Sequence, residues 1–161
     1  MPGRVTCSRQ TRRAALAVLA GAAVIGVRRL AAEPVAPVKV WKDPNCGCCS
    51  GWVDHLRRSG FSVAVVDTAD LAAVKSQLGV PGKLASCHTA QIDSYLIEGH
   101  VPAAAIRRLL AERPAALGLA VPGMPVGSPG MEGDPPQLYD VILFSAEATT
   151  VYARFLGSEP R

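Results

Sequence analysis

Apolar residues follow two spacings along this chain, one typical of strands and one typical of helices. Segments 38–41 and 61–68 are short and rich in β-branched residues, which predicts two strands. The second is apolar at nearly every position, which predicts that it is buried on both faces. Segments 49–60, 69–80 and 102–113 place apolar residues at helical spacing and are bounded by Gly or Pro. They therefore predict three helices.

The order of these segments predicts an α/β protein. A strand, a helix and a second strand in succession predict a right-handed parallel crossover. Segment 87–99 fits either two strands or one bent strand. Segment 118–136 is dense in Gly and Pro, which predicts a long loop. Segments 139–144 and 149–155 then predict a C-terminal β-hairpin.

The first 32 residues have the pattern of an export signal rather than of a folded element. Arg12 and Arg13 precede an unbroken apolar run from Ala14 to Val27, and small residues follow at Ala31 and Ala32. The paired arginines resemble a twin-arginine signal. The alternative is an uncleaved membrane anchor, although the apolar run is short for a bilayer span. Both interpretations predict that the rest of the chain lies outside the cytoplasm, in the periplasm.

Separating this segment changes the charge of the remaining chain. We take residues 1–32 as the twin-arginine-like signal, 33–37 as a Pro-containing linker and 38–156 as the folded domain. The signal holds six arginines and no acidic residue, so the remainder has 11 basic and 13 acidic residues. A net charge of −2 gives no support for nucleic-acid binding, which needs a basic surface. We expect membrane contact only through an uncleaved signal.

Four cysteines remain after the signal, and three of them lie together in "DPNCGCCSGW". Cys46 and Cys49 have Cys-x-x-Cys spacing between a predicted strand and a predicted helix, which is the thioredoxin arrangement. The free N–H groups at the start of a helix favour the thiolate of a cysteine placed there. A thiolate is both the nucleophile of disulfide exchange and a soft ligand for Cu(I) or Zn(II). The leading fold hypothesis is therefore a thioredoxin-like α/β sandwich with a Gly/Pro-rich loop and a hairpin at its C-terminal end.

Cys48 distinguishes the redox and metal interpretations. A dithiol pair needs two cysteines, and a third beside them favours scrambling, whereas a thiolate metal site uses all three. Cys87, in "ASCHTA", is the fourth, and in a thioredoxin-like layout it faces the start of the first helix. Two structural disulfides remain an alternative.

Histidine and methionine are weaker candidates for ligands. His88 follows Cys87 and fits either a ligand or a half-buried strand residue. We expect His55 to face solvent and His100 to brace the third helix. Met124 and Met131 lie in the Gly/Pro-rich loop, where a thioether suits Cu(I), although methionine more often fills apolar space.

Four motifs taken together resemble the CopG-type proteins: "DPNCGCCSGW", "SCHTA", "IEGHVPA" and "GLAVPGMPVGSPGME". These are exported metal-binding proteins associated with bacterial copper resistance, long known only as a domain of unknown function. The resemblance runs from Val38 to Phe155 and implies a thioredoxin-like fold. It implies copper as the metal, with Cys46, Cys48, Cys49 and Cys87 as ligands and the methionine-bearing loop as a further contributor.

The leading hypothesis is an exported protein that holds Cu(I), as a small thiolate-bridged cluster, for sequestration or a change of oxidation state. Another exported copper-handling protein is the partner that this role implies. The first alternative is a thiol–disulfide oxidoreductase that uses Cys46 as nucleophile and Cys49 as resolving cysteine. The second is a binding module whose Gly/Pro-rich loop docks a partner.

Overall fold

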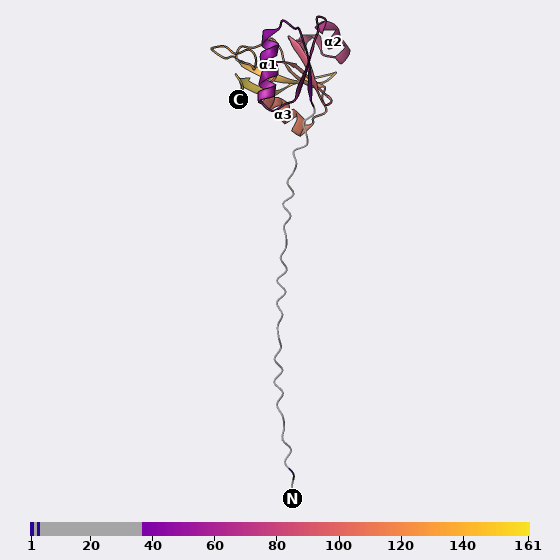
Figure 1. Cartoon of the computed structure of the whole chain (residues 1–161), viewed down its shortest axis with the longest axis vertical. Helices are drawn as coiled ribbons and strands as arrows, with labels where there is room; N and C mark the ends of the chain where they lie inside the picture. Colours follow the sequence, from indigo (N-terminus) through magenta and orange to yellow (C-terminus); the bar gives the residue numbers. More distant parts are fainter. Residues whose placement is uncertain (2, 4–36) are drawn as a thin grey trace. The chain divides into compact units, whose positions relative to one another are not determined.

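The computed structural model describes residues 37–161 together with Met1 and Gly3 (Figure 1). Apart from those two residues, the predicted signal 1–32 lies outside the described part, as does the linker up to Ala36. Residues 37–161 fall within one compact unit, Pro34–Arg161. None of the helices in the described part is long and apolar enough to cross a membrane.

The described residues form a mixed α/β fold with one eight-stranded sheet, three α-helices and a short 3-10 helix. The sheet order is β2-β1-β3-β4-β5-β6-β7-β8. The strands are β1 Val38–Lys42, β2 Val63–Asp67, β3 His88–Ile92, β4 Tyr95–Gly99, β5 Gly118–Val121, β6 Leu138–Phe144, β7 Thr149–Leu156 and β8 Glu159–Pro160. The helices are α1 Gly47–Arg58, α2 Leu71–Leu78, α3 Ala103–Glu112 and the 3-10 helix η1 Gly82–Leu84.

The crossover and both hairpins agree with the sequence analysis. β1 and β2 are parallel and are joined through α1, as the strand–helix–strand order predicts. Segment 87–99 forms two antiparallel strands, β3 and β4, rather than one bent strand. β6 and β7 form the predicted C-terminal hairpin. The sequence-based prediction of a mixed α/β protein is therefore confirmed.

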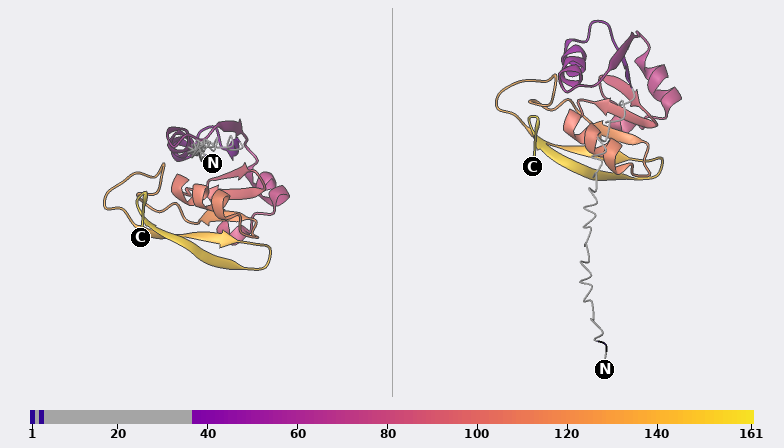
Figure 2. Two further views of the ribbon diagram at one scale, coloured as in Figure 1. Left: turned by 90° about the horizontal axis from the view of Figure 1, so that it is seen from below. Right: turned by 60° about the horizontal axis from the view of Figure 1, so that its bottom comes forward.

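Helices cover both faces of the sheet (Figure 2). The larger core joins α1 and α3 to the strands and includes Trp52, Leu56, Ile97 and Ile106. The smaller core includes Leu96 and lies against the end of α2 and η1. Since neighbouring residues of a strand point to opposite faces, β4 is buried on both sides.

Two predictions about strands were wrong. β2 was expected to be buried on both faces, but it is one of the two edge strands of the described sheet, and Val65 and Val66 are more than one third exposed. Its apolar run reflects β-propensity rather than burial. Gly118–Val121 was expected to be loop, but it forms β5 between β4 and β6. A Cβ at Gly118 would overlap Leu96 O, so this glycine allows the close strand contact.

Candidate metal centre

The Cys-rich segment begins in a tight turn after β1. Asn45 N donates to Asp43 Oδ1 at 2.7 Å and Cys46 N donates to Asp43 O at 3.1 Å. The buried Lys42 ammonium donates to the carbonyls of Asp43 and Pro44, at 3.1 and 3.4 Å, and pairs with a β2 carboxylate. These contacts fix the turn that leads into α1.

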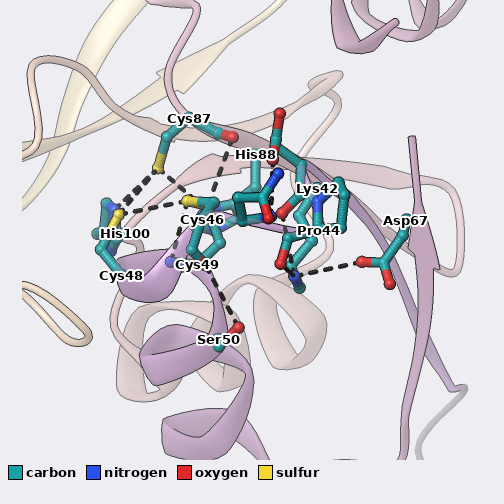
Figure 3. The surroundings of a disulfide bond; sticks show 12 residues. Lys42, Pro44, Cys46, Cys48, Cys49, Ser50, Asp67, Cys87, His88 and His100 are labelled. Carbon is teal, nitrogen blue, oxygen red and sulfur yellow. Dashed lines mark hydrogen bonds and ion pairs between the residues drawn. A yellow bond between two sulfur atoms is a disulfide. The ribbon is translucent and has the colours of Figure 1, made fainter. Parts of the chain in front are cut away.

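Cys46 is the N-cap of α1, and its Sγ accepts from Cys49 N at 3.3 Å. The predicted position of the first cysteine at a helix N-terminus is therefore confirmed. Cys46 and Cys49 form a disulfide, and Cys48 and Cys87 are free thiols (Figure 3). Cys49 is fully buried, whereas the other three cysteines are partly accessible.

The four cysteines lie together at the start of α1. Cys48 Sγ lies 3.4 Å from Cys46 Sγ and 3.9 Å from Cys87 Sγ. Cys49 Sγ lies 3.5 Å from Cys87 O. All four sulfur atoms are within 4.8 Å of one another. The fold thus brings Cys87 to the three cysteines that precede it by about forty positions, and it does so through the pairing of β3 with β1.

Burial, with Cys48 as the next cause, raises the pKa of the Cys87 thiol. Two thiolates side by side repel each other, so a proton is retained on the pair unless a cation joins them. A metal ion reverses this balance because it stabilises both thiolates. The arrangement is thus more suited to a cation than to two bare thiolates.

Two buried imidazoles extend the cluster beyond the cysteines. His88 Nδ1 lies 3.3 Å from Cys87 Sγ, and His100 Nε2 lies 3.0 Å from the same sulfur. The two rings meet edge to face at a centroid distance of 5.0 Å, and Trp52 packs on His88 at 4.4 Å. Burial lowers the pKa of both histidines, so each is held as a neutral imidazole.

His88 and His100 differ in how their second nitrogen is satisfied. His100 Nδ1 donates to Pro129 O at 2.8 Å, because a carbonyl oxygen can only accept. His100 Nε2 therefore directs a lone pair toward Cys87 Sγ. His88 Nε2 is buried and has no hydrogen-bond partner among the described residues. A buried nitrogen without a partner is unusual, and it leaves His88 with an unused ligand atom.

His100 was placed at the third helix by the sequence analysis, but it lies in the cysteine cluster. Its place follows from strand pairing: β3 and β4 pair Thr89 with Glu98, and extending this register by two residues sets Cys87 opposite His100. Sequence alone left open whether segment 87–99 forms two strands or one bent strand, and it gave no register. Once the register is known, His100 is a candidate ligand.

His55 was expected to face solvent, and this was wrong. His55 is half-buried, and its Nε2 accepts from Ala103 N, the first residue of α3, at 3.1 Å. Pro102, the N-cap of that helix, has no side-chain acceptor to offer. His55 therefore satisfies a free N–H at the start of α3. Within the described residues it belongs to neither group of clustered metal-ligand side chains.

The Gly/Pro-rich loop packs against the start of α1. A Cβ built on Gly130 would lie 2.5 Å from Cys48 O and 2.6 Å from Trp52 N, so only glycine allows this contact. Met131 directly follows Gly130 in the sequence and is partly buried. Met124 is 42% exposed. The roles of both methionines as ligands stay predictions.

The described residues therefore offer two overlapping sets of donors that fit a metal ion. One is the four cysteine sulfurs, and the other is Cys87 with His88 and His100. Thiolate and neutral imidazole are donors that suit Cu and Zn rather than Mg or Ca. Fold and site together define a mixed α/β protein with a cysteine–histidine cluster capable of binding metal.

Comparisons with known proteins agree with this class. The family model "Protein of unknown function, DUF411" matches residues 84–131. Two solved structures of "Copper resistance protein copG", Form 1 and Form 2, match with 49% and 50% identity and a TM-score of 0.71 each. Each match covers 76% of this chain and 99% of the other. No curated protein sequence matched the chain.

This chain belongs to the CopG family of copper resistance proteins. The resemblance that the four sequence motifs gave is confirmed. Family membership and the cysteine cluster together indicate a role in copper resistance.

Proposed function

We propose that this protein is exported to the periplasm and binds copper as Cu(I) through Cys46, Cys48, Cys49 and Cys87. The observation that carries the proposal is the gathering of four sulfur atoms within 4.8 Å of one another. Soft thiolate ligands favour Cu(I) and Zn(II) over harder metals such as Mg or Ca. Export rests on the basic and apolar pattern of residues 1–32, and copper rests on the relatives named copper resistance protein.

Full use of the site requires reduction of the Cys46–Cys49 disulfide. In the structure only Cys48 and Cys87 are free thiols among the described cysteines. Two electrons and two protons convert the disulfide into two thiols, which then give up protons as they bind metal. The reduced protein therefore offers four thiolates at one place. Because a thiolate sulfur can bridge two ions, these favour a small Cu(I) cluster.

The same chemistry couples copper to its oxidation state. Two Cu(II) ions can take one electron each from the Cys46 and Cys49 thiols, which gives two Cu(I) ions, one disulfide and two protons. Because this reaction balances in electrons and protons, we include redox interconversion of copper in the proposed function. His88, His100, Met124 and Met131 are the further ligands proposed for the site. The thioredoxin-like assignment is supported by the Cys-x-x-Cys that follows β1 and opens α1.

Thiol–disulfide oxidoreduction is a second candidate function, and the Cys46–Cys49 disulfide favours it. In that function Cys46 attacks a substrate disulfide and Cys49 resolves the mixed disulfide. The Cys46 thiolate is stabilised by the N-terminus of α1, which Cys46 caps. The partner is then a protein disulfide, whereas the copper function implies another exported copper-handling protein.

Cys48→Ser separates the two functions. The substitution leaves both members of the Cys46–Cys49 pair in place, but it removes the sulfur that lies between Cys46 and Cys87. We expect Cu(I) affinity to fall by more than the roughly tenfold that loss of an outer-shell partner causes, since here a ligand itself is lost. Disulfide reductase activity should stay unchanged. An unchanged Cu(I) affinity together with high reductase activity would instead favour the oxidoreductase.

A further inference from the structure

A buried charge network lies behind the cluster, on the opposite face of the sheet from His88. Glu98 of β4 is fully buried. Its Oε1 accepts from Lys75 Nζ at 2.5 Å and from Ser86 N at 2.6 Å, and its Oε2 accepts from Thr89 Oγ1 at 2.7 Å. Lys75 Nζ also donates to Thr89 Oγ1 at 2.7 Å. The carboxylate therefore makes three hydrogen bonds and meets one cation.

Two of the hydrogen-bond partners of Glu98 flank Cys87–His88 in the sequence: Ser86 on one side and Thr89 on the other. Thr89 is within β3 and pairs directly with Glu98 across the ladder. Ser86 precedes β3, where no strand partner receives its amide, and the Glu98 carboxylate receives it instead. One side chain of β4 thus holds the Cys87–His88 segment at both ends.

Ser86 is also held by close packing. A Cβ built on Gly99 would lie 2.6 Å from Ser86 Oγ and 2.7 Å from Val121 O. Gly99 has φ +71°, a conformation that glycine adopts without strain. The segment before Cys87 therefore rests against the end of β4, directly beside His100.

Stability alone gives little reason for this network. Burying an ion pair removes both charges from water, and apolar residues of similar volume often serve stability equally well. Lys75 is 13% exposed and the Glu98 side chain is fully buried, so the cost of desolvation falls on both. What the carboxylate provides that an apolar side chain cannot is a fixed acceptor on each side of Cys87–His88.

We propose that Glu98, with its charge balanced by Lys75, is a positioning residue for the Cys87 thiol. It acts through Ser86 and Thr89, and it does not touch the metal. The proposal rests on the proposed function of the cysteine cluster. Without this network, Cys87 Sγ no longer keeps its place between Cys48 and His100, and the fourth thiolate is lost from the site.

A matched pair of double variants tests this. Glu98→Gln with Lys75→Met removes both charges but keeps an amide that can bond to Ser86 N and Thr89 Oγ1. Glu98→Met with Lys75→Met removes the charges and both bonds. Because neither variant leaves a lone buried charge, the pair isolates the bonds that hold the segment. Asp140→Asn with Arg154→Met, which breaks an ion pair between β6 and β7, is the control elsewhere in the fold.

Two measurements are made on each folded variant. The first is Cu(I) affinity by competition with a chelator. The second needs no copper: the alkylation rate of Cys87 in the reduced metal-free protein, located by mass spectrometry and compared with that of Cys48. For Glu98→Met/Lys75→Met we expect Cu(I) affinity to fall by about tenfold or more and Cys87 to be alkylated several times faster. Glu98→Gln/Lys75→Met and the control should match the unmodified protein.

Wild-type affinity and wild-type alkylation in folded Glu98→Met/Lys75→Met overturn the proposal. Equal losses in the Gln and Met pairs also overturn it, since the charge would then matter and the bonds would not. If Glu98→Met/Lys75→Met does not fold, Thr89→Val, which removes the hydrogen bonds of Thr89 to Glu98 and Lys75, must shift both measurements in the same direction, or the proposal fails. If the unmodified protein binds no Cu(I), the proposed function fails, and alkylation still decides whether Glu98 positions Cys87.

Discussion

His100 Nε2 lies 3.0 Å from Cys87 Sγ, while the opposite nitrogen of the same ring donates to Pro129 O at 2.8 Å. The hydrogen bond to the Gly/Pro-rich loop fixes both the tautomer and the ring orientation. This relation links β4, the loop and the cysteine cluster through one side chain. It makes the imidazole a candidate ligand.

His100→Ala should therefore weaken copper binding. The substitution removes a buried donor and also the group that fixes the loop at Pro129. We expect Cu(I) affinity to fall by about tenfold to a hundredfold. The measurement is competition with a chelator, and His55→Ala is the control histidine because it lies outside the cluster. Equal effects of the two substitutions would contradict a specific role for His100.

Gly130→Ala should displace the loop from the first turn of α1. Gly130 has φ +86°, and a Cβ there would overlap Cys48 O and Trp52 N. Gly123→Ala is a matched control, because Gly123 has φ +80° with nothing within 4 Å of the added carbon. Both substitutions carry a backbone cost of about 1–2 kcal/mol in the free energy of unfolding. Only Gly130→Ala should cost more and also lower Cu(I) affinity, as denaturant unfolding and copper titration would show. Similar results for the two variants would contradict the packing argument.

The predicted methionine ligands are tested by Met124→Leu and Met131→Leu. Leucine keeps the apolar volume, with a cost below about 1.5 kcal/mol in the free energy of unfolding, but it lacks the thioether sulfur. We expect Met131→Leu to lower Cu(I) affinity more than Met124→Leu, since Met131 adjoins Gly130 at the start of α1. The measurement is chelator competition on each single variant and on the double variant. Wild-type affinity in the double variant would show that the loop contributes packing alone.

The fold was largely predictable because periodicity and turn residues determine its elements. The three helices and the C-terminal hairpin follow from local sequence, whereas segment 87–99 was left open between two strands and one bent strand. The edge position of β2 and the existence of β5 did not follow from local sequence, because burial and strand pairing depend on neighbours that lie far away in the sequence. An apolar run such as Val63–Asp67 has the same pattern in a central strand and at an edge.

The site was predictable to the extent that chemistry is local. Three cysteines within four positions indicate a shared site whatever the fold. Cys87 was predicted to face the start of the first helix by analogy with the thioredoxin layout. His100 required the antiparallel register of β3 and β4. The contact of His55 could be predicted only from the packing of α1 against the start of α3. The Glu98 network could be predicted only by knowing which side chains of β4 lie on each face of the sheet. Contacts of this kind are set by tertiary structure, so no motif signals them.

His55 should make the stability of the protein sensitive to mild acid. Burial, followed by the charge of Arg58, lowers the pKa of His55, whereas Glu132 opposes this. The folded state therefore binds its proton at lower pH than the unfolded state, in which the pKa is about 6.5. The contribution of neutral His55 is fully present above that pH. It is lost progressively as the pH falls toward the folded-state pKa.

Urea unfolding of the unmodified protein and of His55→Gln at pH 7.5 and pH 5 measures this contribution. Glutamine can still accept from Ala103 N but does not titrate, so His55→Gln should lose less stability between the two values. The comparison isolates His55 from His88 and His100, whose pKa values burial also lowers. The same loss in both proteins would contradict the capping role of His55.

The central claim is that the four cysteines act together as a Cu(I) site. Its most direct test is an anaerobic Cu(I) titration of the reduced protein, made without residues 1–32, against a competing chelator, with free thiols counted before and after. The account predicts tight uptake of more than one Cu(I) per chain and protection of all four thiols. Weak or absent uptake, with a readily reduced and re-formed Cys46–Cys49 disulfide, would contradict it and favour the oxidoreductase.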